Sequence, residues 1–330
     1  MTLSQERSPS LSLIPSRPSI QDQWKSSVAI ATEFLLATRK ELSSRRPGEH
    51  CSLPQNVQSL TWQDLKYNPT VLASLIECYR QGYGAGGLHE WGEGAFCSQH
   101  GWAHLVDLPD YETQLARGDN SCPHCSKGAL APCYPPEKVS SKIEHCLTSG
   151  TQAQVAVKYD GADKKKVVGF CWGANCNQAQ LKERLNLAIQ DTCTPTPASE
   201  GETANPQIEA LFETVKALNR PTLFIDEILI SPKFRGGPST IMDLTRPLLN
   251  TGSESGAKTA VCWTSPNSNV FPLLKAIGFT PFAAMGQPQN KQIVFLLHNN
   301  LPALAKFVAS VNPSEMRKFL VKNRKRKLKH

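Results

Sequence analysis

Two short pairs of cysteine and histidine residues carry the clearest chemical signal in this 330-residue chain. Cys97 is followed three positions later by His100, and after 21 further residues Cys122 is followed three positions later by Cys125. Thiolate and imidazole groups bind Zn²⁺, and two such pairs can converge on one tetrahedral ion. Because no carboxylate-rich open position accompanies them, the set predicts a closed, structural zinc site.

The fourth ligand of this predicted site has alternatives in the sequence. His104, His124 and Cys133 each stand close enough along the chain to replace His100. A different interpretation is that the cysteines are unrelated loop residues. If the metal is bound, it folds an insertion over about residues 94–134, which has too little apolar content to fold alone.

A second group of chemically capable residues lies near the middle of the chain. Asp226 and Glu227 interrupt an apolar, β-branched run that starts at Thr222 and ends before Pro232, and this run is typical of a mostly buried strand. Strand alternation predicts that the two carboxylates point to opposite faces, so that only one of them faces a cleft and exchanges protons there.

The residues after this strand predict an anion site. Arg235, Gly236 and Gly237 form a short turn, and Pro238 suits the first position of a helix that continues through an apolar pattern. The start of a helix offers backbone N–H groups without helical partners, and glycines let a phosphate approach them closely. An ordinary connection between a strand and a helix is the alternative interpretation.

The order of elements continues in a recognisable way. A strand is expected at Thr259–Thr264, a helix at Asn267–Ile277, and two short strands around Pro281–Ala284 and Gln292–Leu297. Together with Glu227–Gly236 (EILISPKFRG) and with Asn267 followed by Gly278-Phe279, this region resembles the GNAT superfamily of acetyl-CoA-dependent N-acetyltransferases. The resemblance covers roughly residues 57–298 and is strongest over 223–279.

The resemblance implies an α/β (α+β) fold, with a GNAT-like mixed central sheet flanked by helices and a small zinc-ribbon-like insertion. It implies that acetyl-CoA is the cosubstrate and that an amine, on a protein or a small molecule, is the acceptor. Glu227 is then the general base; the alternatives are a structural carboxylate and proton transfer through water. The implied cofactor contacts are Ile228, Leu229, Ile230, Arg235, Gly236, Gly237, Ser239 and Asn267.

Three positions depart from the pattern of that superfamily. Pro238 and Thr240 stand where its phosphate loop has glycine and glycine or alanine, and Leu274 stands where a tyrosine is usual. These departures favour a second function class, a catalytically degenerate GNAT fold that serves as a zinc-containing protein or nucleic-acid interaction module. A zinc-ribbon protein that acts on DNA is a third.

The remaining elements predict one central domain with an additional segment at each end of the chain. Helices are expected at Pro69–Tyr83, Pro135–Leu147, Gln178–Ile189 and Leu301–Val311, and a hairpin joins Ala153–Tyr159 to Lys166–Trp172. The predicted organisation is an N-terminal Ser/Pro-rich tail and helix (1–56), an acetyltransferase-like domain (57–300) with a flexible linker at about 192–206, and C-terminal helices with a basic tail (301–330).

The charge of the chain is concentrated at its C-terminal end. The chain has 36 Lys and Arg against 28 Asp and Glu, and eight of the basic residues lie in 317–330. Residues 1–316 therefore contain 28 basic and 28 acidic residues. The tail is a candidate contact for nucleic acid or an acidic surface, or for nuclear targeting, or is simply solvated. With no convincing secretory signal or transmembrane stretch, we expect a reducing, cytoplasmic location, or a nuclear one.

Overall fold

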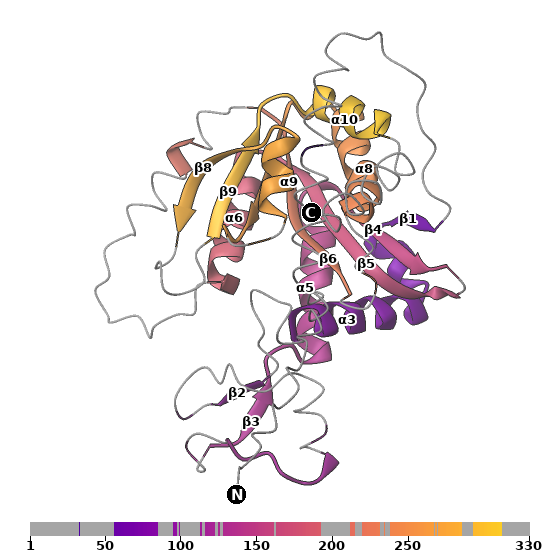
Figure 1. Ribbon diagram of the computed structural model, residues 1–330, viewed down its shortest axis with the longest axis vertical. Coiled ribbons are helices and arrows are strands. Elements are labelled where there is room, and N and C mark those ends of the chain that lie inside the picture. Colours follow the sequence, from indigo (N-terminus) through magenta and orange to yellow (C-terminus); the bar gives the residue numbers. More distant parts are fainter. Residues whose placement is uncertain are drawn as a thin grey trace, which may run out of the picture.

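The computed structural model shows one central sheet with helices on both faces (Figure 1). The residues that the structure describes are 33, 56–84, 95–97, 99, 113, 116–122, 125, 128–161, 163–192, 212–214, 220–231, 234, 238–266, 268, 270–285 and 293–311. The predicted basic tail, nearly all of the predicted linker and nearly all of the N-terminal segment lie outside these residues.

The central sheet has seven strands in the order β1-β4-β5-β6-β7-β9-β8. Its strands are β1 (Val57–Leu60), β4 (Thr151–Asp160), β5 (Asp163–Cys176), β6 (Thr222–Ile230), β7 (Thr259–Thr264), β8 (Thr280–Met285) and β9 (Ile293–His298). β6 and β7 run parallel and all the other neighbours are antiparallel, so the sheet is mixed. The predicted mixed sheet is therefore confirmed.

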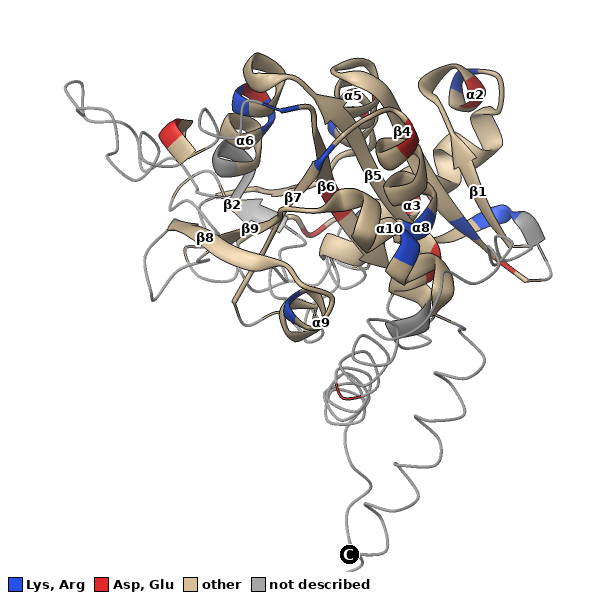
Figure 2. Cartoon of the chain, turned by 90° about the horizontal axis from the view of Figure 1, so that it is seen from above, with Lys and Arg blue, Asp and Glu red and all other residues tan. Residues whose placement is uncertain are grey.

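Helices cover both faces of this sheet. On one face lie α8 (Pro238–Glu254), α9 (Phe271–Ala276) and α10 (Leu301–Ser310), and on the other lie α2 (Trp62–Lys66), α3 (Pro69–Gly84), α5 (Pro136–Thr148) and α6 (Gln178–Thr192). Figure 2, seen from above, separates α5 and α6 from α8, α9 and α10 across the strands. Apolar side chains are buried between the sheet and the helices on each face, so the fold has three layers.

The position of β6 explains its apolar sequence. It is an inner strand between β5 and β7, and seven of its nine residues are buried. A strand covered by helices on both faces reads as a nearly continuous apolar run rather than as an alternating one. The mostly buried strand that the sequence predicts at 222–230 is thus an inner member of the sheet, beside 259–264.

Most of the predicted elements appear with small shifts at their ends. The hairpin, the strand at 259–264 and the helix start at Pro238 are confirmed. The helix expected from Asn267 is shorter and begins at Phe271, because Pro272 fills its first turn and has no N–H to donate to a preceding turn.

A second, two-stranded sheet pairs β2 (Ala95–Cys97) with β3 (Leu130–Pro132) and lies beyond α3 and α5 at one end of the molecule (Figure 1). It falls within the predicted zinc-binding insertion. No helix in the described part of the chain has the length and apolar character needed to span a membrane.

Candidate active site and candidate metal centre

The strands β6 and β7 separate where the predicted catalytic region begins. Their parallel ladder joins Thr222–Ile225 to Thr259–Cys262 and ends at the Ile225–Cys262 pair. β6 nevertheless continues to Ile230 and stays paired with β5 as far as the Gly169–Ile230 pair. The two strands therefore diverge at their carboxyl ends, next to the backbone of Ile228–Ile230, where the sequence predicts contacts with the cosubstrate.

A β-bulge at Asp226 sets the direction of the two carboxylates. Trp172 of β5 pairs with Glu227, but the next residue, Gly173, pairs with Ile225, so Asp226 is an extra residue in β6. Ile225 packs in the cluster under α8, whereas the side chains of Asp226 and Glu227 both reach side chains of α5. The predicted placement on opposite faces is wrong, because the bulge interrupts the alternation.

Glu227 is buried, and side chains from α5 and α3 contact it. Its side chain is 2% exposed, and its Oε1 lies 2.5 Å from Nζ of Lys142 on α5. The hydroxyl of Tyr79 on α3 donates to the same oxygen at 3.5 Å. The carboxylate predicted as general base thus sits between an ammonium and a phenol, two residues past the end of the ladder between β6 and β7.

Aromatic rings enclose this carboxylate. Tyr79 stacks on Trp172 with ring centroids 5.8 Å apart, and Tyr83 and Tyr134 pack beside Tyr79. Burial, followed by the charge of Glu227, raises the pKa of Tyr79 and of Tyr83 well above the ordinary value. Both phenols therefore remain protonated at neutral pH, and the hydroxyl of Tyr79 donates to Glu227.

Asp226 belongs to a separate network that fastens helices to the sheet. Arg184 on α6 makes an ion pair with Asp226 at 3.3 Å and also donates to the carbonyl oxygens of Cys146 and Ser149. The thiol of Cys146 donates to Asp226 at 3.2 Å, and burial raises the pKa of Cys146 well above its usual range. Asp226 therefore has a structural role in holding α5 and α6 against β6.

The predicted phosphate-binding turn is only partly described. Arg235, Gly236, Gly237 and Asn267 lie outside the described residues, and of Ser239 only its position in the first turn of α8 is described. The order of strand, turn and helix around them is confirmed, since β6 ends at Ile230 and α8 begins at Pro238.

Leu274 lines an apolar cavity between β6, α8 and α9. The cavity has a volume of about 30 Å³ and is lined by Ile225, Ile241, Met242, Thr245, Leu249, Val270, Leu273, Leu274, Ile277 and Phe279. This volume holds no more than a few water molecules and offers no acid group to a leaving thiolate.

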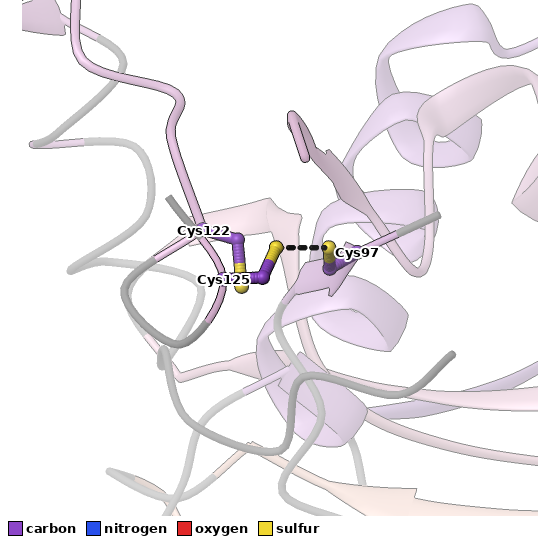
Figure 3. A group of neighbouring side chains, drawn as sticks. All are labelled: Cys97, Cys122 and Cys125. Carbon is purple, nitrogen blue, oxygen red and sulfur yellow. Dashed lines mark hydrogen bonds between the residues drawn. The ribbon is translucent and has the colours of Figure 1, made fainter. Parts of the chain in front are cut away.

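Three of the four predicted metal ligands come together. The Sγ atoms of Cys97, Cys122 and Cys125 all lie within 4.8 Å of one another (Figure 3). The Sγ atoms of Cys97 and Cys125 are 3.7 Å apart. Two sulfur ligands of one tetrahedral zinc ion, each with a Zn–S bond of about 2.3 Å, would lie roughly 3.8 Å apart. His100 lies outside the described residues, as do the alternatives His104 and His124.

The backbone around the cysteines suits thiolate ligands. The N–H of Gly128 donates to Sγ of Cys125 at 3.3 Å, which stabilises negative charge on that sulfur. A Cβ atom at Gly128 would stand 2.5 Å from Sγ of Cys97, so only glycine leaves this sulfur free to turn towards the others. Cys133 is half-buried and outside this group, and burial raises its pKa to about 11.

Reasoning from the sequence missed Lys142 and Tyr79. Both lie on helices that the sequence predicts, but they meet Glu227 only through tertiary packing, 85 and 148 positions away along the chain. A lysine and a tyrosine on amphipathic helices carry no local signal of such a contact.

No family model and no curated protein matches the chain. Among solved structures, the polyamine N-acetyltransferase of Drosophila melanogaster matches at 14% identity over 50% of this chain and 83% of its own, with a TM-score of 0.33. A GNAT superfamily phosphinothricin acetyltransferase from Sinorhizobium meliloti matches at 11% identity over 74% and 89%, with a TM-score of 0.38. Because both scores lie below 0.5, the fold assignment rests on the strand order and pairing of this chain.

Proposed function

We propose that this protein is an acetyl-CoA-dependent N-acetyltransferase in which an amine attacks the thioester directly and Glu227 accepts the proton. One observation carries the proposal: Glu227 is a buried carboxylate at a β-bulge, next to the point where β6 and β7 diverge. An extended thiol-linked arm would enter where these inner strands diverge, from the side of α8. The carboxylate then meets an acceptor that arrives from the side of α3 and α5.

The backbone of β6 has the chemistry to hold such an arm. Past Ile225 the edge of β6 that faced β7 no longer forms the parallel ladder. Residues Ile228–Ile230 would pair with the amide groups of the arm, and one backbone N–H would stabilise an oxyanion. When bound, acetyl-CoA supplies an acetyl group that is activated as a thioester. Arg235, Gly236, Gly237 and Ser239, at the start of α8, would hold its diphosphate, with Asn267 as a further contact.

Glu227 has the surroundings of a proton acceptor that must work without bulk water. Its carboxylate is buried, and the hydroxyl of Tyr79 fixes its direction through a hydrogen bond. An acceptor amine beside Oε1 would transfer its proton to Glu227 as the N–C bond forms. With Leu274 in an apolar cavity, the departing thiolate would take its proton from water or from the acceptor ammonium.

A second candidate function is favoured by the ion pair itself. Lys142 neutralises Glu227, and a buried, neutralised carboxylate also fits a fold that has lost catalysis and serves as an interaction module. Isothermal titration with acetyl-CoA separates the two functions. Saturable micromolar binding, together with thiol release when a panel of amines is added, supports the enzyme. The absence of both supports the interaction module.

The three converging thiols support a structural zinc site in this protein. Cys97, Cys122 and Cys125 would supply three thiolates and His100 the fourth ligand. We also retain as proposals the contact of the tail 317–330 with a polyanion and a cytoplasmic or nuclear location. Steeply salt-dependent binding to nucleic acid or acidic vesicles that is lost on deleting this tail would support that contact.

A further inference from the structure

The proposed general base already has a primary amine beside it. Nζ of Lys142 lies 2.5 Å from Oε1 of Glu227 and 5.6 Å from the centroid of the Tyr79 ring. A carboxylate together with the face of an aromatic ring is the pair of groups that recognises an alkylammonium ion. The folded chain therefore presents one of its own ammonium groups at the position that the mechanism assigns to an acceptor.

Two other lysines in the described part of the chain pair with different carboxylates. Lys158 pairs with Asp243, and Lys166 pairs with Asp160. Lys142 also keeps access to solvent, because its side chain is 23% exposed while that of Glu227 is 2% exposed. Its long, flexible stem allows Nζ to move towards the point where β6 and β7 diverge while the backbone of α5 stays in place.

We propose that Lys142 is acetylated in cis, within the same molecule, by the active site it occupies. This inference rests on the proposed function. The ammonium of Lys142 gives one proton to the carboxylate of Glu227, and the neutral Nζ attacks the acetyl carbon of acetyl-CoA. The N–C bond forms and the C–S bond breaks. The second proton, which the nitrogen loses as the amide forms, goes to the departing thiolate, which leaves as free CoA, and Glu227 releases the first proton to water. The products are an amide at Lys142 and one thiol per acetyl group.

The modification changes the site in a defined way. The amide of acetylated Lys142 carries no charge, so its ion pair with Glu227 is lost. Glu227 is then available to an external amine. The geometry also indicates the class of that acceptor, a primary alkylamine that enters as an ammonium ion between Glu227 and the Tyr79 ring.

The test uses the full-length protein and isotopically labelled acetyl-CoA. Label at each lysine is followed over time by peptide mass spectrometry, at several protein concentrations. We expect label at Lys142 with a first-order rate constant that does not change with protein concentration. Exposed lysines such as Lys66 and Lys165 report the slow, uncatalysed background.

Variants assign the reaction to the site. K142R keeps a cation beside Glu227 but cannot form this product, so label on that peptide is lost. K158R alters a paired lysine outside the site and leaves label at Lys142 unchanged. E227Q lowers the rate at Lys142 by about a hundredfold, as expected for removal of a general base. Because E227Q leaves Lys142 without its carboxylate, folding is checked by circular dichroism, and E227D, which keeps the charge, serves as a second variant.

The outcomes separate this inference from the proposed function. If added amines release thiol while Lys142 is labelled no faster than Lys165, acetylation in cis is overturned and the acetyltransferase stands. A rate at Lys142 that rises with protein concentration also overturns it, since the reaction is then between molecules. If there is neither acetyl-CoA binding nor thiol release, both the inference and the proposed function fall.

Discussion

The hydroxyl of Tyr79 and the carboxylate of Glu227 meet at 3.5 Å although 148 positions separate them in the chain. Tyr79 reaches this place from α3, and Glu227 reaches it because the bulge in β6 turns it towards the same face. The contact joins the helical layer to the inner strand at the point where β6 and β7 diverge.

Replacing Glu227 by glutamine should reduce kcat with amine acceptors by about 10²- to 10⁴-fold, because a positioned general base contributes about that much. The measurement is thiol release under saturating acetyl-CoA. E77Q is the matched control, since Glu77 is a carboxylate on α3 whose side chain is 48% exposed. A rate close to that of the unmodified protein would assign the proton transfer to water and leave Glu227 with a structural role.

Replacing Lys142 by methionine should lower the free energy of unfolding by on the order of 3 kcal/mol, because it leaves the buried charge of Glu227 without its ammonium partner. Urea denaturation measures the loss. The double variant K142M/E227Q removes both charges and should recover most of it, which a double-mutant cycle would show as coupling. A single variant within about 0.5 kcal/mol of the original protein would contradict this account.

Gly82→Ala should destabilise the protein by about 1–3 kcal/mol through overpacking. A Cβ atom at Gly82 would lie 2.2 Å from the Leu229 side chain, so α3 could no longer approach β6 this closely. Thermal unfolding provides the measurement. Gly161→Ala is the control, because a Cβ atom there has open space within 4 Å. Equal melting temperatures for the two variants would show that α3 and β6 adjust without cost.

The purified protein should contain one zinc ion per chain, bound by Cys97, Cys122 and Cys125 with a fourth ligand. Cys97→Ser should abolish stoichiometric zinc, as measured by elemental analysis and by a chelator-dependent colour assay. Cys133→Ser should keep the zinc, because Cys133 lies outside the converging group. His100→Ala tests the fourth ligand, and full zinc content in that variant would direct attention to His104 or His124.

Unfolding should become easier at alkaline pH because of the buried phenols. Burial raises the pKa of Tyr79 and Tyr83 in the folded state above the usual 10.0. Their stabilisation is complete below the unfolded pKa of 10.0 and is lost as the pH rises through that value towards the folded pKa. Denaturant midpoints from pH 8 to 11 should therefore fall less steeply in Y79F. Y67F is the control, since Tyr67 is 86% exposed, and identical slopes in all three proteins would contradict the prediction.

The sequence by itself determined most strands of the sheet and their order along the chain. The strands 222–230 and 259–264, the helix start at Pro238 and the convergence of three cysteines all follow from local patterns, because apolar periodicity, proline and paired cysteines act over short distances. The resemblance to the GNAT superfamily that these elements carry implied a mixed sheet flanked by helices, and the structure has such a sheet.

The tertiary structure alone decided how the site is built. The bulge at Asp226 depends on the register between β5 and β6, and nothing in the sequence of β6 marks the extra residue. It reversed the prediction for the two carboxylates, because one additional residue shifts the alternation of side chains. Lys142 and Tyr79, which contact Glu227, were likewise not predicted as its partners. Packing of α3 and α5 on the sheet brings these residues together, and no local pattern connects them.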